Sequence, residues 1–240
     1  NFGNPEHPEV MWQLSEAVDG MTEALDAFGV PCVGGNVSLY NESRGRDIDP
    51  TPVVGLLGMV DRLDRRPPGV GLVDGGRLVL VGETVPELAG SQWAADHGHR
   101  GRGVLPALDL AAVDAAATAV RELVAAGLVQ GAHDVARGGV ALALAEMAVR
   151  SGIGFTAARL PDHTALFSES SGRAVLCVDA EQLRVVLDVL EARGVPHSRI
   201  GVAGGDRMVV KDQFDLPVAG AVATYRDRLP DALGSGTTQG

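Results

Sequence analysis

The sequence predicts a protein of the α+β or α/β class, in which a helix and two strands precede a larger mixed α/β sandwich. Three observations support this prediction. Apolar residues recur at helical spacing over residues 8–28. Short β-branched runs then alternate with Ala-rich segments along the rest of the chain. The composition is rich in Ala, Val, Leu and Gly and only 4% aromatic, which suits helices packed closely on sheets.

The first expected element is a helix over residues 8–28. Pro8 suits the first turn of a helix, and Gly29 suits the left-handed residue that ends one. Apolar side chains three or four residues apart form one stripe along it: Met11, Leu14, Val18, Met21, Leu25 and Phe28. We expect this stripe to pack into a core, together with Trp12.

Two strands with a polar, hairpin-like loop between them are expected next. Val30–Val33 and Pro52–Val60 are apolar and β-branched, whereas Asn41–Asp49 is polar and charged. Asp61–Gly71 contains two consecutive prolines followed by glycine and is the best linker candidate. We therefore expect a domain boundary after residue 66.

The second region predicts an alternation of strands and helices. Its expected strands are Arg77–Gly82, Leu128–Asp134, Ile153–Ala157, Ala174–Val178, and a closing hairpin of Ile200–Val202 with Met208–Val210. Its expected helices are Asp109–Ala126, Val140–Arg150, Glu181–Arg193 and a terminal helix that ends near Leu233. Glu83–Leu105 reads as a long Gly-rich connection, and Ser235–Gly240 as a frayed polar tail.

Charge and length exclude several functional classes. The net charge of −11 and the lack of a Lys/Arg-rich run argue against nucleic-acid binding. No apolar run approaches the roughly 18 residues of a membrane span, and no signal peptide opens the chain. The two cysteines, Cys32 and Cys177, lie far apart in apolar runs, and we expect both to be buried thiols of a reducing compartment. A cytoplasmic protein is therefore expected.

The segment Gly34–Asn41 is the first candidate site. Two glycines at the end of a strand let backbone N–H groups approach an anion closely. The amide oxygen of Asn36 suits Mg²⁺, and Ser38 lies on the same side of an extended chain as Asn36. The structural alternative is a Gly-rich bulge with an Asn in a turn. The motif alone favours that alternative, because short Gly motifs are weak evidence.

Two segments of the second region are further candidates. Ala132–Gly139 lies between a strand and a helix, where free N–H groups can meet an anion. Alternatively it is a tight turn in which Asp134 caps a backbone group. Leu166–Ser170 places Glu169 between two serines, either beside a ligand or in a solvated loop. The six histidines are interpreted as loop residues, and no Walker A or GxGxxG motif is present.

Several short segments follow one another in an order that makes them more specific together than any single motif. They are Asn1–Glu6, Pro8–Glu9, Gly35–Asn41, Thr51–Gly55, Gly90–Ser91, Ala132–Asp134, Gly138–Gly139, Ala145–Met147, Phe167–Ser170 and Gly204–Asp206. In this order they resemble the second half of the large subunit in the phosphoribosylformylglycinamidine synthase family. The resemblance covers nearly the whole chain.

This resemblance implies a fold like that of aminoimidazole ribonucleotide synthetase. Residues 1–66 would end the second small, sheet-forming domain, residues 67–234 would form the second large domain of the C-terminal type, and residues 235–240 a flexible tail. The implied activity is that of a ligase in purine biosynthesis. It converts formylglycinamide ribonucleotide, glutamine-derived ammonia and ATP to formylglycinamidine ribonucleotide, ADP and phosphate. The chain opens on Asn1 in a loop-like segment, so we expect a fragment. The resemblance implies that the catalytic residues lie outside it, and we expect the fragment alone to be inactive.

The resemblance also implies site residues, cofactors and partners. Gly35 matches an ATP contact, Asn36 a magnesium ligand and Ser38 a substrate contact. The implied cofactors are ATP and Mg²⁺. The implied partners are the formylglycinamide ribonucleotide substrate, the missing N-terminal half of the subunit, a glutaminase subunit and a small bridging subunit. One departure is Arg137, where the family often has an acidic residue, so the loop around it would be structural or a degenerate site.

Two other interpretations stay open. One is another ATP-using enzyme of the superfamily, such as a selenophosphate synthetase, a thiamine-phosphate kinase or a hydrogenase maturation factor. Those enzymes lack the combination of Asn1–Pro5 with Gly35–Asn41. The other is a non-catalytic assembly module, in which the strand around Val53–Val60 pairs with a partner domain.

Overall fold

The computed structural model describes residues 1–59 and 65–234, and the chain divides into two compact units. Unit 1 spans Asn1–Asp64 and unit 2 spans Arg65–Gly240. The assignment of two synthetase domains with a boundary after residue 66 stays a prediction. The expected linker lies partly, and the expected tail wholly, outside the described residues. Within the described ranges, no helix has the length and apolarity needed to cross a membrane.

Unit 1 is built on one long helix, α1 (Pro8–Phe28), which has the bounds that the sequence predicts. It ends at Gly29, whose φ of 61° is left-handed and whose N–H group donates to the Asp26 carbonyl oxygen. The packing prediction for this helix is wrong. Val10 is its buried residue, whereas Trp12 is 62% exposed. Over residues 1–59 the apolar stripe of α1 is not covered as a core would be.

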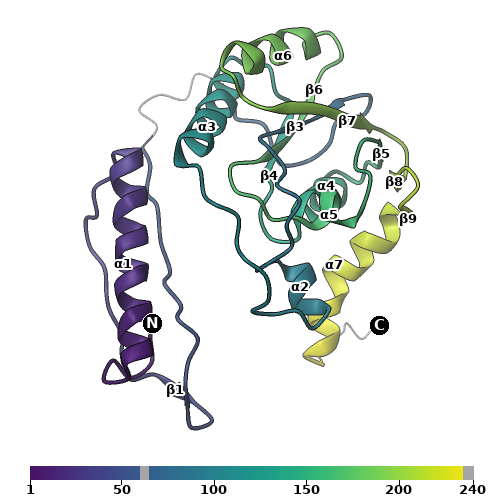
Figure 1. Ribbon diagram of the computed structural model, residues 1–240. Helices are drawn as coiled ribbons and strands as arrows, with labels where there is room; N and C mark the ends of the chain where they lie inside the picture. The colour runs from purple at the N-terminus through teal and green to yellow at the C-terminus, as the bar shows by residue number, and fades with distance from the viewer. Residues whose placement is uncertain (60–64, 235–240) are drawn as a thin grey trace. The chain divides into compact units, whose positions relative to one another are not determined.

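A small hairpin and two extended segments complete unit 1. β1 (Glu42–Ser43) and β2 (Arg46–Asp47) pair antiparallel, which confirms the hairpin-like loop. The two expected strands are not formed in the described residues, where 30–37 and 52–59 run along either side of α1 in Figure 1. A strand requires a neighbour for its N–H and C=O groups, and the described part of unit 1 offers none there. Cys32, expected to be buried, is therefore exposed.

Unit 2 is a sandwich around a seven-stranded mixed sheet with the order β4-β6-β3-β7-β5-β8-β9. β5 and β8 run parallel, and the other neighbouring strands are antiparallel. The strands are β3 (Arg77–Val81), β4 (Gly131–Asp134), β5 (Phe155–Ala157), β6 (Ala174–Val178), β7 (His197–Ala203), β8 (Arg207–Val210) and β9 (Phe214–Pro217). The mixed α/β sandwich that the sequence predicts is confirmed.

Helices cover both faces of this sheet. The helices in the described part of unit 2 are α2 (Gln92–Asp96), α3 (Leu110–Ala125), α4 (Gly139–Ser151), α5 (His163–Phe167), α6 (Leu183–Ala192) and α7 (Val218–Ala232). Successive side chains of β3 alternate between two cores, because Leu78 and Leu80 point to one face and Val79 and Val81 to the other. Helices α4, α5 and α7 pack on the Leu78 face, and α3 and α6 pack on the Val79 face (Figure 1).

The expected closing hairpin of unit 2 is wrong. β7 and β8 are not neighbours, because β5 lies between them and pairs antiparallel with β7 and parallel with β8. The hairpin partner of β8 is β9. Two short helices also interrupt segments expected to be loops. The side chain of Ser91 caps α2 by accepting the Ala94 N–H group, and the side chain of Asp162 caps α5.

Candidate functional site

The three residues predicted to bind ligands lie on one extended segment of unit 1. A Cβ atom built at Gly35 would have nothing within 4 Å, and Asn36 is exposed. Ser38 is half-buried, and its Oγ lies 3.1 Å from Nδ2 of Asn41. The described residues of unit 1 do not enclose these groups in a cleft, so their roles stay a prediction.

The backbone around Ser38 is hydrogen-bonded to the first residues of the chain. The Phe2 N–H group donates to the Ser38 carbonyl oxygen at 3.0 Å, and the Tyr40 N–H group donates to that of Gly3 at 2.8 Å. The side-chain amide of Asn41 donates to the Phe2 carbonyl oxygen at 3.0 Å. Two segments that carry the family resemblance, Asn1–Glu6 and Gly35–Asn41, therefore lie side by side.

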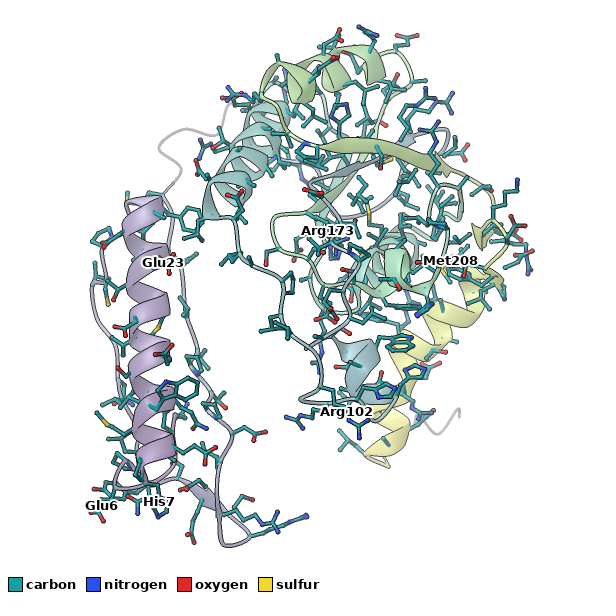
Figure 2. The ribbon with its side chains drawn as sticks, viewed as in Figure 1. Glu6, His7, Glu23, Arg102, Arg173 and Met208 are labelled. Carbon is teal, nitrogen blue, oxygen red and sulfur yellow. The ribbon has the colours of Figure 1, made fainter. Side chains whose placement is uncertain are left out.

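Asp47 fastens the same N-terminal segment to the hairpin. Its carboxylate accepts the Asn4 N–H group at 2.7 Å and lies 2.7 Å from Nδ1 of His7. These two hydrogen bonds hold the pKa of Asp47 below its ordinary value of 3.8, and the bond from Asn4 has the larger effect. Gly3 permits the close approach, because a Cβ atom there would meet Asp47 Oδ1 at 2.4 Å. Figure 2 shows His7 at the start of α1, where this contact is made.

A cavity of about 420 Å³ opens in unit 2 beside the start of α3. Four carboxylates line it, those of Glu83, Glu87, Asp109 and Glu169, and none of its lining residues is Lys or Arg. Three of the four already accept backbone hydrogen bonds. Glu87 accepts from Leu88 and Ala89, Asp109 from Ala112, and Glu169 from Gln92 and Gly138. With all four carboxylates present, this lining disfavours a phosphate group in the cavity.

The two candidate segments of unit 2 meet at Glu169. Its Oε1 accepts the N–H groups of Gly138, at 2.8 Å, and of Gln92, at 2.7 Å. Arg137 adds a side-chain contact, since its Nε donates to Oε1 of Gln92 at 2.7 Å. Glu169, rather than Asp134, is thus the carboxylate that accepts a backbone N–H group in the turn before α4. The Asp134 side chain is 78% exposed and lies beside His133.

A buried polar network lies beneath Glu169. Ser168 Oγ donates to the Val85 carbonyl oxygen at 2.7 Å, and Ser170 Oγ accepts the Val85 N–H group at 2.9 Å. Arg173 is 4% exposed and donates to the carbonyl oxygens of Ser168 and Ser170. Its Nη1 also donates to Oγ1 of Thr84 at 2.9 Å. The loop after β3 and the segment before β6 are therefore joined by hydrogen bonds inside unit 2.

The charged guanidinium group of Arg173 lies in the interior of unit 2, and Figure 2 labels this residue. Burial lowers the pKa of Arg173 to about 10, and the negative charge of Glu169 opposes that shift. The guanidinium group is therefore still protonated at neutral pH. Sequence reasoning missed this residue, because a buried arginine has no periodic signal. The polar run from Ser168 to Arg173 directly before an apolar strand is the signal that could have pointed to it.

Comparison with known families matches both parts of the chain. The C-terminal domain of AIR synthase related proteins matches residues 73–213, and the N-terminal domain of the same proteins matches residues 1–60. The phosphoribosylformylglycinamidine synthase subunit PurL of Nocardioides sp. is 44% identical over 98% of this chain and 31% of the relative. That of Moorella thermoacetica is 43% identical over 96% of this chain and 32% of the relative. The chain thus spans about a third of the length of these curated relatives.

Solved structures show the same fold. Thermotoga maritima PurL complexed with ATP has a TM-score of 0.61 at 20% identity, covering 85% of this chain and 35% of that chain. The same protein complexed with FGAR has a TM-score of 0.56 at 20% identity, covering 65% of this chain and 29% of that chain. At this level of identity the likeness concerns the fold alone.

Proposed function

Because the chain belongs to the AIR synthase related protein family, we propose that it forms the C-terminal portion of a phosphoribosylformylglycinamidine synthase large subunit. The reaction of such a subunit converts formylglycinamide ribonucleotide, glutamine-derived ammonia and ATP to formylglycinamidine ribonucleotide, ADP and phosphate. The observation that carries this proposal is the 44% identity to a PurL subunit, sustained over 98% of the chain. Both family models also match in the order expected for one synthetase half.

The chain contributes three contacts to this reaction in our proposal. The N–H group of Gly35 donates to the nucleotide, the amide oxygen of Asn36 faces the metal, and the hydroxyl group of Ser38 orients the sugar-phosphate substrate. The open space around Gly35 supports this role, since nothing lies within 4 Å of a Cβ atom built there. Bound magnesium offsets the negative charge of the phosphates. The segment is then a positioning element, and the proton-transferring groups lie elsewhere in the subunit.

Asn36 supplies one oxygen ligand of a hard cation rather than a complete metal site. Residues 1–59 and 65–234 hold no group of three or more His, Cys, Asp and Glu side chains placed around a metal ion. Magnesium prefers six oxygen ligands, several of which are water molecules and phosphate oxygens. We therefore propose that the other protein ligands come from the rest of the subunit.

The exposed apolar surface of unit 1 supports the same assignment. Trp12 is 62% exposed, Val53 82% and Leu57 97%, which is unusual for a surface that remains in water. We propose that the rest of the large subunit covers this surface and that the chain is inactive alone. A glutaminase subunit and a small bridging subunit complete the cytoplasmic assembly in this proposal.

A hybrid subunit tests the role of Asn36. In the hybrid, this chain replaces the matching third of the Nocardioides PurL subunit. We expect Asn36→Ala to raise the KM for Mg²⁺ in ATP hydrolysis by about 10- to 100-fold, because an oxygen ligand is lost. Asn36→Asp restores an oxygen ligand and should recover most of the affinity.

Ser43→Ala, in the exposed hairpin of unit 1, is the matched control and should leave the KM unchanged. A hybrid in which Asn36→Ala retains the parental KM for Mg²⁺ and the parental rate would show that Asn36 is not a metal ligand. The unmodified hybrid, measured in parallel, establishes that the replacement itself preserves activity.

A further inference from the structure

Glu169 joins two segments that are far apart in the sequence. Its Oε1 accepts one N–H group 31 positions away, at Gly138, and another 77 positions away, at Gln92. Gly138 is the residue before α4, a helix of 13 residues, and Gln92 opens α2. The first N–H groups of a helix are unpaired within the helix and attract negative charge. The Glu169 carboxylate therefore lies where an anion would otherwise bind.

The surrounding chain leaves Glu169 little freedom to move away. Ser168 and Ser170 are buried, with 0% and 7% exposure, and both bind the backbone of Val85. Successive side chains of an extended segment point to opposite sides, so Glu169 points away from these serines toward the turn. Gly139 allows the approach, since a Cβ atom there would lie 2.4 Å from the Leu166 carbonyl oxygen.

The charge of Glu169 also has a partner inside the protein. The buried guanidinium group of Arg173 donates its hydrogen bonds to neutral oxygens, those of Ser168, Ser170 and Thr84. The negative charge of Glu169 acts on this guanidinium group through space. Loss of the Glu169 carboxylate would leave two N–H groups without their acceptor and a buried cation without this countercharge. Such a position favours an anion from solution.

We propose that Glu169 is a built-in anion that fills this position and excludes inorganic phosphate and phosphate esters from the turn at Gly138. The loop that resembles a phosphate site by its Gly138–Gly139 pair is thereby a structural turn. The inference does not rest on the proposed function. It has a consequence for that function, because the phosphates of the substrates must then be held outside this turn.

Removal of the carboxylate should create a phosphate site. The 240-residue chain is prepared with Glu169→Ala and with Glu83→Ala, which removes the same charge from the same cavity. Thermal unfolding is then followed in inorganic phosphate and in chloride at equal ionic strength. Phosphate should raise the Tm of Glu169→Ala saturably, by at least about 3 °C at concentrations well above Kd. The parent chain and Glu83→Ala should show no such rise.

NMR locates the bound ion. In ¹⁵N–¹H spectra of Glu169→Ala, phosphate should shift the amide signals of Gly138 and Gln92, whereas the parent chain should show no shift of these signals. If Glu169→Ala does not fold in chloride, its refolded fraction in phosphate is compared with that in chloride. A phosphate-specific recovery supports the proposal.

Three results would overturn the proposal. One is a Tm of Glu169→Ala, or a refolded fraction, that responds to phosphate no more than to chloride. Another is an equal phosphate response in the parent chain or in Glu83→Ala. The third is phosphate binding to Glu169→Ala that leaves both amide signals unmoved.

Discussion

Arg173 shows how a single residue can hold two loops together from the inside. Its guanidinium group donates to the backbone of Ser168 and Ser170 and to the hydroxyl group of Thr84. Arg173→Ala leaves these acceptors without a donor and leaves a cavity where the side chain lay. We expect the free energy of unfolding of the chain to fall by about 3 kcal/mol, measured by urea denaturation.

Arg184→Ala is the control for Arg173. The Arg184 side chain is 82% exposed and pairs with Asp188 four residues along α6. Exposed pairs of this kind contribute little, so its loss should change the unfolding free energy by less than about 0.5 kcal/mol. If both substitutions lowered the free energy of unfolding equally, the buried hydrogen bonds of Arg173 would not stabilise the fold as we expect.

The two cysteines should react at very different rates. Cys32 is exposed and Cys177 is buried in β6, where burial raises the pKa of its thiol. Because the thiolate is the reactive form, we expect a disulfide reagent at mildly alkaline pH to label Cys177 at least about 100-fold more slowly than Cys32. In denaturant both should react alike. Similar rates in the folded chain would contradict the burial of Cys177.

The raised pKa of Cys177 also sets a pH dependence. The folded chain binds the thiol proton more tightly than the unfolded chain, whose thiol titrates near the ordinary value of 9.0. This contribution to stability is therefore fully present below pH 9.0 and is lost as pH rises toward the folded-state pKa.

The start of α4 depends on a close contact that only glycine permits. Gly139 has a φ of 66°, and a Cβ atom there would lie 2.4 Å from the Leu166 carbonyl oxygen. Gly139→Ala must therefore strain the backbone and also push the Glu169 segment away. We expect it to lower the free energy of unfolding by about 3 kcal/mol, measured by urea denaturation.

Gly152, at the other end of the same helix, provides the matched control. Its φ of 72° is similar, but a Cβ atom built there has nothing within 4 Å. Gly152→Ala should thus lower the free energy of unfolding only through backbone strain at a positive φ, by about 1 kcal/mol. If the two substitutions cost the same, the contact between the α4 turn and the segment before Glu169 does not contribute to stability.

Elements that depend on sequence patterns within one segment were predicted, whereas features that depend on contacts between distant segments were not. The bounds of α1 follow from apolar spacing with Pro8 and Gly29 at its ends, all of which are read within one segment. The strand order of unit 2 is not local. β5 pairs with β7 and β8, which come later in the chain, so neighbouring strands in the sequence were wrongly joined as a hairpin.

Burial in unit 1 failed as a prediction for a related reason. Apolar spacing shows which face of a helix can be buried, but it does not show what covers that face. None of the stripe residues of α1 is fully buried, and the segments 30–37 and 52–59 on either side of it are exposed in the described part of unit 1. The hydrogen bonds of Glu169 could not be predicted either, because its partners Gly138 and Gln92 lie 31 and 77 residues away in the sequence.

For the molecule as a whole, family membership rests on both units, while the candidate ligand contacts rest on one segment of unit 1. The order of motifs was enough to suggest the family, since it depends on the whole chain rather than on one loop. The ligand roles of Gly35, Asn36 and Ser38 stay a prediction, because the described residues of unit 1 do not enclose these groups in a cleft.

The decisive measurement is the rate of ATP hydrolysis with and without formylglycinamide ribonucleotide, for the isolated chain and for the hybrid subunit. We predict that the isolated chain hydrolyses no ATP under either condition. The hybrid should hydrolyse ATP at least about 100-fold faster with the ribonucleotide than without it, since binding energy from the whole site is needed for catalysis. Substrate-dependent hydrolysis by the isolated chain, or a hybrid whose hydrolysis ignores the ribonucleotide while the parent relative responds to it, would contradict this assignment.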